Sequence, residues 1–332
     1  MNTIFTSSHS LNDTGTAPND RSVMSTSAAC VILGLSFLVG APGNLLVIWT
    51  ILKHIRQRSH TVLLILHLAV ADLLVLITLP LWMYSLASSW VFGRDTCKAV
   101  VYVVNACMYS SVFLITIMSV ERFVAICYPF KMLGQKSVGT LSKCLGGMWC
   151  VALLLGIPAI LVNDVGETDD GTLQCTFKEF TSDSQELLCL SLESSVGFVI
   201  PFVILAVCYY KVASQLRSIQ SPAKRRSAIL IGCVVATFAL LWLPHHIVNI
   251  ADIVVLSTGS AKPDFRDNVV FVAGALAFIS SSINPVLYAF AARNFQGGLR
   301  RSGFVKLFLD VASNSVKTKQ TLEVQMATQT EV

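Results

Sequence analysis

Seven long apolar stretches constrain this chain more than any other feature. A helix that crosses the hydrocarbon core of a membrane needs about 20 mostly apolar residues. We expect such spans at Ser25–Leu52, Thr61–Leu86, Thr96–Cys127, Thr140–Leu161, Glu186–Arg217, Lys224–Leu256 and Asp267–Ala291. The predicted fold class is therefore an all-α membrane protein, a bundle of seven transmembrane helices.

Composition excludes most other classes of protein. Of the 332 residues, 54% are hydrophobic and only 13% are charged, whereas soluble globular proteins carry about 25% charged residues. Too little polar surface remains to cover a soluble domain. A soluble enzyme, a disordered regulator and a disulfide-stapled secreted module are thereby excluded.

The basic residues predict the orientation. Most of the 24 lysines and arginines follow the first, third, fifth or seventh span, and loops rich in these residues face the cytoplasm. We therefore expect a cytoplasmic carboxyl terminus and an extracellular amino terminus. The glycosylation sequence that begins at Asn12 agrees with this placement.

The chain divides into four expected regions. Residues 1–24 form an extracellular tail, and residues 25–291 form the transmembrane domain. Residues 292–310 are expected to form a short amphipathic helix on membrane lipids, because Phe304, Leu307 and Phe308 recur at helical spacing beside basic residues. Residues 311–332 form a polar tail that we expect to be disordered.

Two of the ten cysteines, Cys97 and Cys175, lie in segments that we expect on the oxidising side. A disulfide between them would pin the loop between the fourth and fifth spans over the mouth of the bundle, and the alternative is two free thiols. That loop is acidic, so we expect it to attract cations and to repel anions mildly.

Asp72 stands in the apolar run Leu68–Leu74, and an ionisable residue inside a span is a functional candidate by default. Its expected neighbours at the same depth are polar: Asn44, Ser111, Ser280 and Asn284. A carboxylate among side-chain oxygens suits a sodium ion, and the alternative is a hydrogen-bonded structural cluster. We expect no other cofactor or metal.

A second polar group lies toward the outer ends of the spans. It comprises Tyr109, Glu193, His245, His246 and Asn249. Such groups around one cavity suit a ligand that carries hydroxyl groups, although they can also satisfy one another around water. The two adjacent histidines do not suit a metal, because adjacent helical residues point about 100° apart.

Glu121 and Arg122 end the third span at the cytoplasmic boundary. We expect Arg122 to exchange Glu121 for Tyr209 or Tyr288 when the bundle opens, and the alternative is a static interfacial salt bridge. The chain has no phosphate-binding loop, nucleophile elbow or zinc signature, so we expect no catalytic role.

Motifs in the spans resemble those of the rhodopsin-like G-protein-coupled receptors. They are Gly43-Asn44, Leu68-Ala69-Val70-Ala71-Asp72, Glu121-Arg122-Phe123, Trp149, Pro201, Phe238, Trp242-Leu243-Pro244 and Asn284-Pro285-Val286-Leu287-Tyr288. The resemblance implies that Glu121, Arg122, Tyr209, Phe238, Trp242, Pro244, Pro285 and Tyr288 form the activation switch.

Within that family, Pro244–Asn249, Leu276–Pro285 and Met108–Val112 resemble the leukotriene B4 receptors of the chemoattractant branch. The resemblance implies ligand contacts at Tyr109, Glu193, Trp242, His245, His246 and Asn249. The chain departs from those receptors at Asn163 and Glu186, where they carry arginines, and at Val101, where they carry a histidine.

We therefore expect a plasma-membrane receptor for leukotriene B4 or a related lipid chemoattractant. The resemblance implies an inhibitory-class heterotrimeric G protein as partner, with arrestin and a receptor kinase at the tail and no nucleic acid. A peptide-binding chemoattractant receptor is the alternative, favoured by the acidic loop. A transporter or channel is a further alternative, but the chain shows no internal repeat.

Overall fold

The computed structural model describes residues 18–55, 59–128, 138–168, 171–177, 180, 182–215, 222–259 and 266–293. Within these residues, seven helical segments are long and apolar enough to cross a membrane. The predicted seven-helix fold class is confirmed. Asn12, the expected amphipathic helix beyond residue 293 and the polar tail lie outside the described residues.

The helices follow the predicted order, although two spans are interrupted. The elements are α1 (Pro18–His54), α2 (His60–Leu76), α3 (Leu79–Ala87), α4 (Arg94–Cys127), α5 (Val138–Val162), β1 (Asn163–Glu167), β2 (Leu173–Phe177), α6 (Asp183–Ser194), η2 (Ser195–Val199), α7 (Ile200–Gln215), α8 (Pro222–Thr258) and α9 (Arg266–Arg293).

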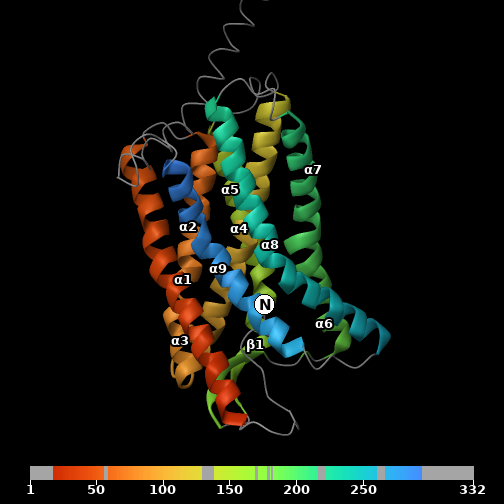
Figure 1. Ribbon diagram of the computed structural model, residues 1–332. Coiled ribbons are helices and arrows are strands. Elements are labelled where there is room, and N and C mark those ends of the chain that lie inside the picture. The colour runs from red at the N-terminus through yellow and green to blue at the C-terminus, as the bar shows by residue number, and fades with distance from the viewer. Residues whose placement is uncertain are drawn as a thin grey trace, which may run out of the picture.

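The third span, α4, lies at the centre of the bundle. It packs against α2, α5, α7 and α8, while α9 packs against α1, α2 and α8. Strand β1, α3 and α6 lie at one end of the bundle (Figure 1). We call this the disulfide end, after Cys97 and Cys175, and we call the opposite end the Arg122 end.

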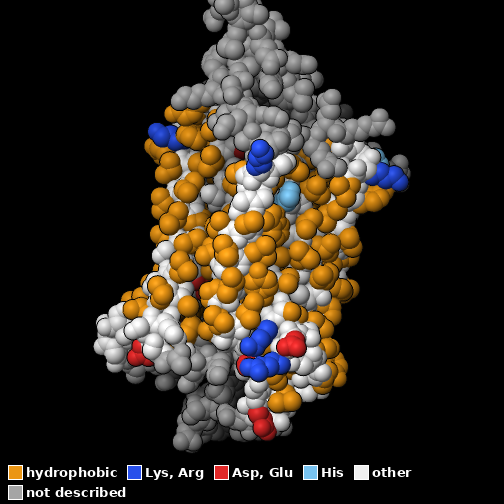
Figure 2. All heavy atoms as spheres, turned by 180° about the vertical axis from the view of Figure 1, so that it is seen from behind, with side chains coloured by type: hydrophobic (Ala, Val, Ile, Leu, Met, Phe, Trp, Pro, Cys, Tyr) orange, Lys and Arg blue, Asp and Glu red, His pale blue; other side chains and the backbone are white. Residues whose placement is uncertain are grey.

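Apolar side chains cover the flank of the bundle as well as its interior. Leu38, Leu154 and Leu240 are all at least 65% exposed. Hydrophobic atoms cover most of the flank in Figure 2, and the charged side chains gather toward its two ends. Lipid, unlike water, favours an apolar exterior, which explains why these helices are apolar on every side.

Proline explains both interruptions. We predicted one helix for the second span, but α2 ends at Leu76 and α3 begins at Leu79, just before Pro80. In the fifth span, the π-helix η2 comes directly before Ile200 and Pro201. Because proline has no N–H, the carbonyl four residues earlier loses its donor, which weakens the helix at these two places.

The loop between α5 and α6 forms a β-hairpin that the sequence analysis did not predict. Strands β1 and β2 pair antiparallel, with Val165 opposite Cys175. Gly171 turns the chain with φ at 73°, in the left-handed region, where glycine is favoured. The short polar strand β1 lacks the alternation of apolar and polar residues that reveals a strand in sequence.

The hairpin is attached at the disulfide end by covalent and polar contacts. The predicted Cys97–Cys175 disulfide is present, with the two Cα atoms 5.6 Å apart. The Gln174 side-chain amide donates to the Ser85 carbonyl at 2.9 Å, and the Ser85 hydroxyl donates to the Gln174 amide oxygen. The disulfide therefore acts together with hydrogen bonds to α3 and holds the hairpin over the bundle.

An ion pair adds a further attachment. Arg94 Nη2 lies 2.6 Å from Asp164 Oδ2, which joins the first turn of α4 to β1. The Arg94 guanidinium beside Asp164 holds the pKa of that carboxyl below its usual range. Asp164 therefore stays ionised to a lower pH than a free aspartate, and the pair persists at neutral pH.

Helices α1 and α9 approach each other closely at two glycines of α1. A Cβ atom on Gly43 would lie 2.6 Å from Cβ of Pro285, and one on Gly40 would lie 2.7 Å from Cβ of Ser282. Both distances are shorter than carbon atoms tolerate. The absence of a side chain at these positions therefore allows α9 to pack beside α1.

Gly43→Ala should destabilise the detergent-solubilised protein by about 1–3 kcal/mol, the usual cost of an overpacked contact. Thermal unfolding of the purified protein measures this loss. Gly147→Ala on α5 is the matched control, because a Cβ there meets nothing within 4 Å. Equal melting temperatures for the two variants would contradict the close approach of α1 and α9.

Candidate functional site

A polar cluster joins α6 to α8 toward the disulfide end. Nε2 of His245 lies 2.7 Å from Oε1 of Glu193, and Nδ2 of Asn249 lies 3.4 Å from the same ring nitrogen. His245 and Asn249 are both buried. The structure thus brings three of the predicted ligand contacts into one hydrogen-bonded group.

A cavity lies beside this cluster, and we call it the deep hollow. It has an empty volume of about 280 Å³. Its lining comes from α4, α6, η2 and α8, namely Asn105, Met108, Tyr109, Val112, Glu193, Gly197, Trp242 and His246. Four of these residues were predicted as ligand contacts, whereas Asn105, Met108, Val112 and Gly197 were missed.

Gly197 helps to keep the deep hollow open. A Cβ atom there would lie 3.4 Å from the ring of Tyr109 and 3.8 Å from that of His246. The π-turn of η2 contains this glycine, and π-turns occur often at functional sites. A larger side chain at this position would narrow the space between α4 and α8.

His246 is a polar residue of the deep hollow whose ring nitrogens have no hydrogen-bond partner among the described residues. It is 1% exposed, and its ring stacks on that of Phe198 with the centroids 4.5 Å apart. Because an unsatisfied buried polar group is costly, His246 suits a hydroxyl group or a water molecule in the hollow.

Asp72 is the second predicted centre, and it is 1% exposed. Asn284 donates to its Oδ2 at 2.7 Å, and Ser111 donates to its Oδ1 at 3.4 Å. Ser281 also hydrogen-bonds to this carboxylate. Asn44 donates to the Ser281 carbonyl at 3.1 Å, so side chains from four spans meet around one buried acid.

Ser280, which was predicted in this cluster, makes a different contact. Its hydroxyl donates to the Ala277 carbonyl at 2.6 Å and accepts from Nε1 of Trp242 at 3.1 Å. Ser281 takes the place predicted for Ser280, because successive helical residues point about 100° apart. Ser280 therefore links Trp242 to α9 beside the Asp72 cluster.

The Asp72 cluster fits a small cation. Oδ1 of Asn44 is buried and has no hydrogen-bond partner among the residues that the structure describes. An amide oxygen, a carboxylate and a serine hydroxyl are the kinds of donor that hard cations prefer.

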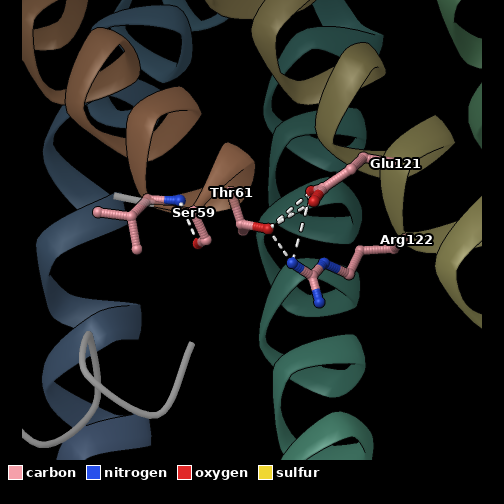
Figure 3. Close-up of polar contacts among 5 residues, drawn as sticks. Ser59, Thr61, Glu121 and Arg122 are labelled. Atoms are coloured by element: carbon pink, nitrogen blue, oxygen red, sulfur yellow. Dashed lines mark hydrogen bonds and ion pairs between the residues drawn. The ribbon is translucent and has the colours of Figure 1, made fainter. Parts of the chain in front are cut away.

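At the Arg122 end, the predicted ion pair is present. Oε2 of Glu121 lies 3.4 Å from Nη2 of Arg122. Thr61 of α2 joins the pair, as Figure 3 shows: its hydroxyl lies 3.0 and 2.7 Å from the two Glu121 oxygens and also accepts from Arg122 Nη2. Thr61 is fully buried, so it ties the charged end of α4 to α2.

The remaining switch residues lie at different depths. Tyr209 is within electrostatic range of Arg122, and its ring packs over Gly232 of α8. Tyr288 is buried within electrostatic range of Asp72. Of the two tyrosines predicted to receive Arg122, the structure therefore places Tyr209 in its neighbourhood and Tyr288 in that of Asp72.

Trp242 connects the deep hollow to the rest of α8. Its ring centroid lies 5.5 Å from that of Phe238, one turn nearer the Arg122 end. Pro244 lies just beyond it inside α8, and Pro285 lies inside α9. Trp242 therefore lies beside the proline of α8, the kind of residue at which helices bend.

Two residues that the sequence analysis missed carry signals in the sequence. Asp252 is buried on α8, seven residues after His245. It is an ionisable residue within an apolar helix, the same signal that identified Asp72. Thr61 had a weaker signal, because hydroxyl side chains are common in membrane helices and only packing against α4 reveals its role.

Comparison with known proteins assigns the family. Residues 43–288 match the 7 transmembrane receptor (rhodopsin family) model. Leukotriene B4 receptor 1 of Homo sapiens is 35% identical over 88% of this chain and 84% of its own length. The same receptor of Bos taurus is 36% identical over 84% of this chain and 82% of its own length.

Chemokine receptors are also similar. C-X-C chemokine receptor type 1 of Oryctolagus cuniculus is 32% identical over 83% of this chain and 78% of its own length. The family match, the seven spans and the ordered motifs agree. The chain therefore belongs to the rhodopsin family of seven-transmembrane receptors, and it is a multi-pass plasma-membrane protein whose partners are an extracellular ligand and a G protein.

Proposed function

We propose that this receptor binds leukotriene B4 or a closely related hydroxylated lipid in the deep hollow, with its disulfide end and amino terminus outside the cell. The relatives named leukotriene B4 receptor 1 support this ligand class. The observation that carries the proposal is His246, a buried side chain in the hollow with both ring nitrogens unpartnered among the described residues.

The lining chemistry favours hydroxyl groups over charge. Tyr109, Glu193 and His246 offer a phenol, a carboxylate and an imidazole to a hydroxyl group. No lysine or arginine is among the described lining residues. The hydroxylated segment of the ligand therefore enters the deep hollow.

The peptide alternative rests on different observations. The C-X-C chemokine receptors are similar over most of the chain. The hairpin and the start of α6 carry acidic side chains, among them Glu167, Asp183 and Glu186. Such a surface attracts a basic peptide.

Signalling follows from the connection between the two ends. A ligand in the deep hollow biases an equilibrium between two packings of the bundle. Trp242 and Phe238 shift, α8 swings about Pro244, and Arg122 exchanges its contacts to Glu121 and Thr61 for a contact to Tyr209. An inhibitory-class G protein then binds the opened Arg122 end.

Several expectations remain part of this proposal. Residues 292–310 form the amphipathic helix on the inner leaflet, and arrestin and a receptor kinase act at the tail. Asn12 carries a glycan in the extracellular segment. Asp72, Asn44 and Ser111, with Asn284 beside them, would hold a sodium ion, whose positive charge would offset the buried carboxylate.

His246→Phe tests the ligand site, because it preserves the ring stack and removes both nitrogens. We expect leukotriene B4 to lose about tenfold in potency in a G-protein nucleotide-exchange assay, the effect of one lost hydrogen bond. An analogue of leukotriene B4 without hydroxyl groups should have the same potency on His246→Phe as on the unaltered receptor.

His67→Phe is the matched control, since His67 accepts a hydrogen bond from Trp149 on another flank of the bundle. A receptor that responds to a basic chemokine peptide and not to micromolar leukotriene B4 would instead support the peptide alternative.

Thr61→Val tests the tie at the Arg122 end. The change keeps the shape of the side chain and removes its contacts to both charged residues. We expect basal nucleotide exchange to rise about tenfold, because a hydrogen bond to a charged group contributes about 1.5–3 kcal/mol. Thr116→Val, which removes only a bond to the carbonyl of its own helix, should leave basal exchange unchanged.

Asp72→Asn tests the sodium site. In the unaltered receptor, sodium is expected to lower agonist affinity relative to potassium or choline, because the ion stabilises the resting arrangement around the buried carboxylate. In Asp72→Asn, agonist affinity in a radioligand competition assay should be the same in sodium as in potassium or choline. Sodium sensitivity that survives in Asp72→Asn would exclude this site.

A further inference from the structure

A second hollow opens beside the deep hollow, between α4, α5 and α6, and we call it the side hollow. Its empty volume of about 390 Å³ includes space that is open to solvent. Helix α5 contributes Leu155, Pro158, Ala159 and Val162, and α6 contributes Cys189 and Leu192. These walls are apolar apart from the thiol.

The two hollows share residues. Asn105, Tyr109 and Glu193 line both of them. The polar groups therefore stand at the junction, and apolar walls lead away from it toward α5. One elongated molecule can place a hydroxyl group at the junction and a hydrocarbon chain in the side hollow.

The side hollow also reaches the flank of the bundle. Leu192 lines it and is nevertheless 40% exposed, and Leu188 on the preceding turn is 68% exposed. Leu161 of α5, next to the lining residue Val162, is 73% exposed. These exposed leucines belong to the lipid-facing surface beside the hollow, and Phe180, which follows β2, completes the lining toward the hairpin.

The hairpin covers the mouth of the bundle, which leaves the side hollow as the apolar space for a long chain. The disulfide, the Gln174–Ser85 contacts and the Arg94–Asp164 pair hold it over the mouth. Transfer of a long apolar chain from the acidic, water-facing mouth to the apolar wall of the side hollow is favourable, because it removes apolar surface from water.

We propose that the side hollow is the subsite for the hydrocarbon chain of the ligand, whose hydroxyl groups bind at Tyr109 and Glu193. This inference rests on the proposed lipid ligand and deepens it. It assigns the ligand a bent pose, with its polar segment at the junction and its apolar chain between α5 and α6. Ala159, which is buried and small, then determines how much chain the receptor accepts.

Ala159→Phe fills the side hollow and provides the first test. We expect the potency of leukotriene B4 in nucleotide exchange to fall at least tenfold, while a chain-shortened dihydroxy analogue keeps its potency. Leu154→Phe is the control, because it places the same aromatic ring on the exposed face of the same helix. Equal losses for the long and short ligands, or no loss for either, would overturn the assignment.

Cys189 provides a second test that does not depend on signalling. The full-length receptor in membranes is treated with decyl methanethiosulfonate, and labelling is followed by mass spectrometry of the peptides that contain Cys189 and Cys150. Cys150 is an exposed thiol on α5 and serves as the internal control. We expect Ala159→Phe to slow labelling at Cys189 about tenfold and to leave Cys150 unchanged.

Leukotriene B4 should slow the labelling of Cys189 in the unaltered receptor to a similar extent. If Ala159→Phe slows the labelling of Cys189 but the unaltered receptor does not respond to leukotriene B4, the proposed ligand is wrong and the side hollow still accepts an apolar chain. If Cys189 is labelled at the same rate in the unaltered receptor and in Ala159→Phe, the side hollow is not an accessible site. A leukotriene B4 response without protection of Cys189 would show that the chain of the ligand does not occupy the side hollow.

Discussion

The structure depends on one constraint, the absence of water in the hydrocarbon core. Every backbone polar group there must find a partner within the protein, so each crossing is a helix. The same constraint acts on side chains. Asp72, Glu193, Arg122 and His246 are all inside the bundle, where three of them have polar partners and His246 lines a cavity.

Prolines lie next to the elements that line the deep hollow. Pro201 follows the π-turn that contains Gly197, and that glycine leaves space between Tyr109 and His246. Pro244 lies inside the continuous helix α8, two residues after Trp242, which lines the hollow. The irregular backbone of η2 thus shapes the site, and Pro244 is the hinge that we propose for α8.

Polar groups lie at three depths along the bundle. Glu193 and His245 lie beside the deep hollow, and Trp242 reaches from that hollow to Ser280. Ser281, the next residue, contacts the Asp72 cluster, and Tyr288 lies within electrostatic range of Asp72. Thr61, Glu121 and Arg122 form a separate group that joins α2 to α4 at the opposite end.

The sequence alone predicted the seven spans, the disulfide pair and the buried ionisable residues Asp72, Glu193 and Arg122, although Asp252 was missed. Hydropathy and the cost of burying charge act locally along the chain, so they can be recognised in the sequence. Tertiary packing decided which groups meet. Packing places Ser281, and not Ser280, against the Asp72 carboxylate, and it places the Thr61 hydroxyl against Arg122. It also formed the hairpin and joined the two hollows at Tyr109. Helical rotation, helix contacts and strand register set these pairings, and none of them leaves a periodic signal in the sequence.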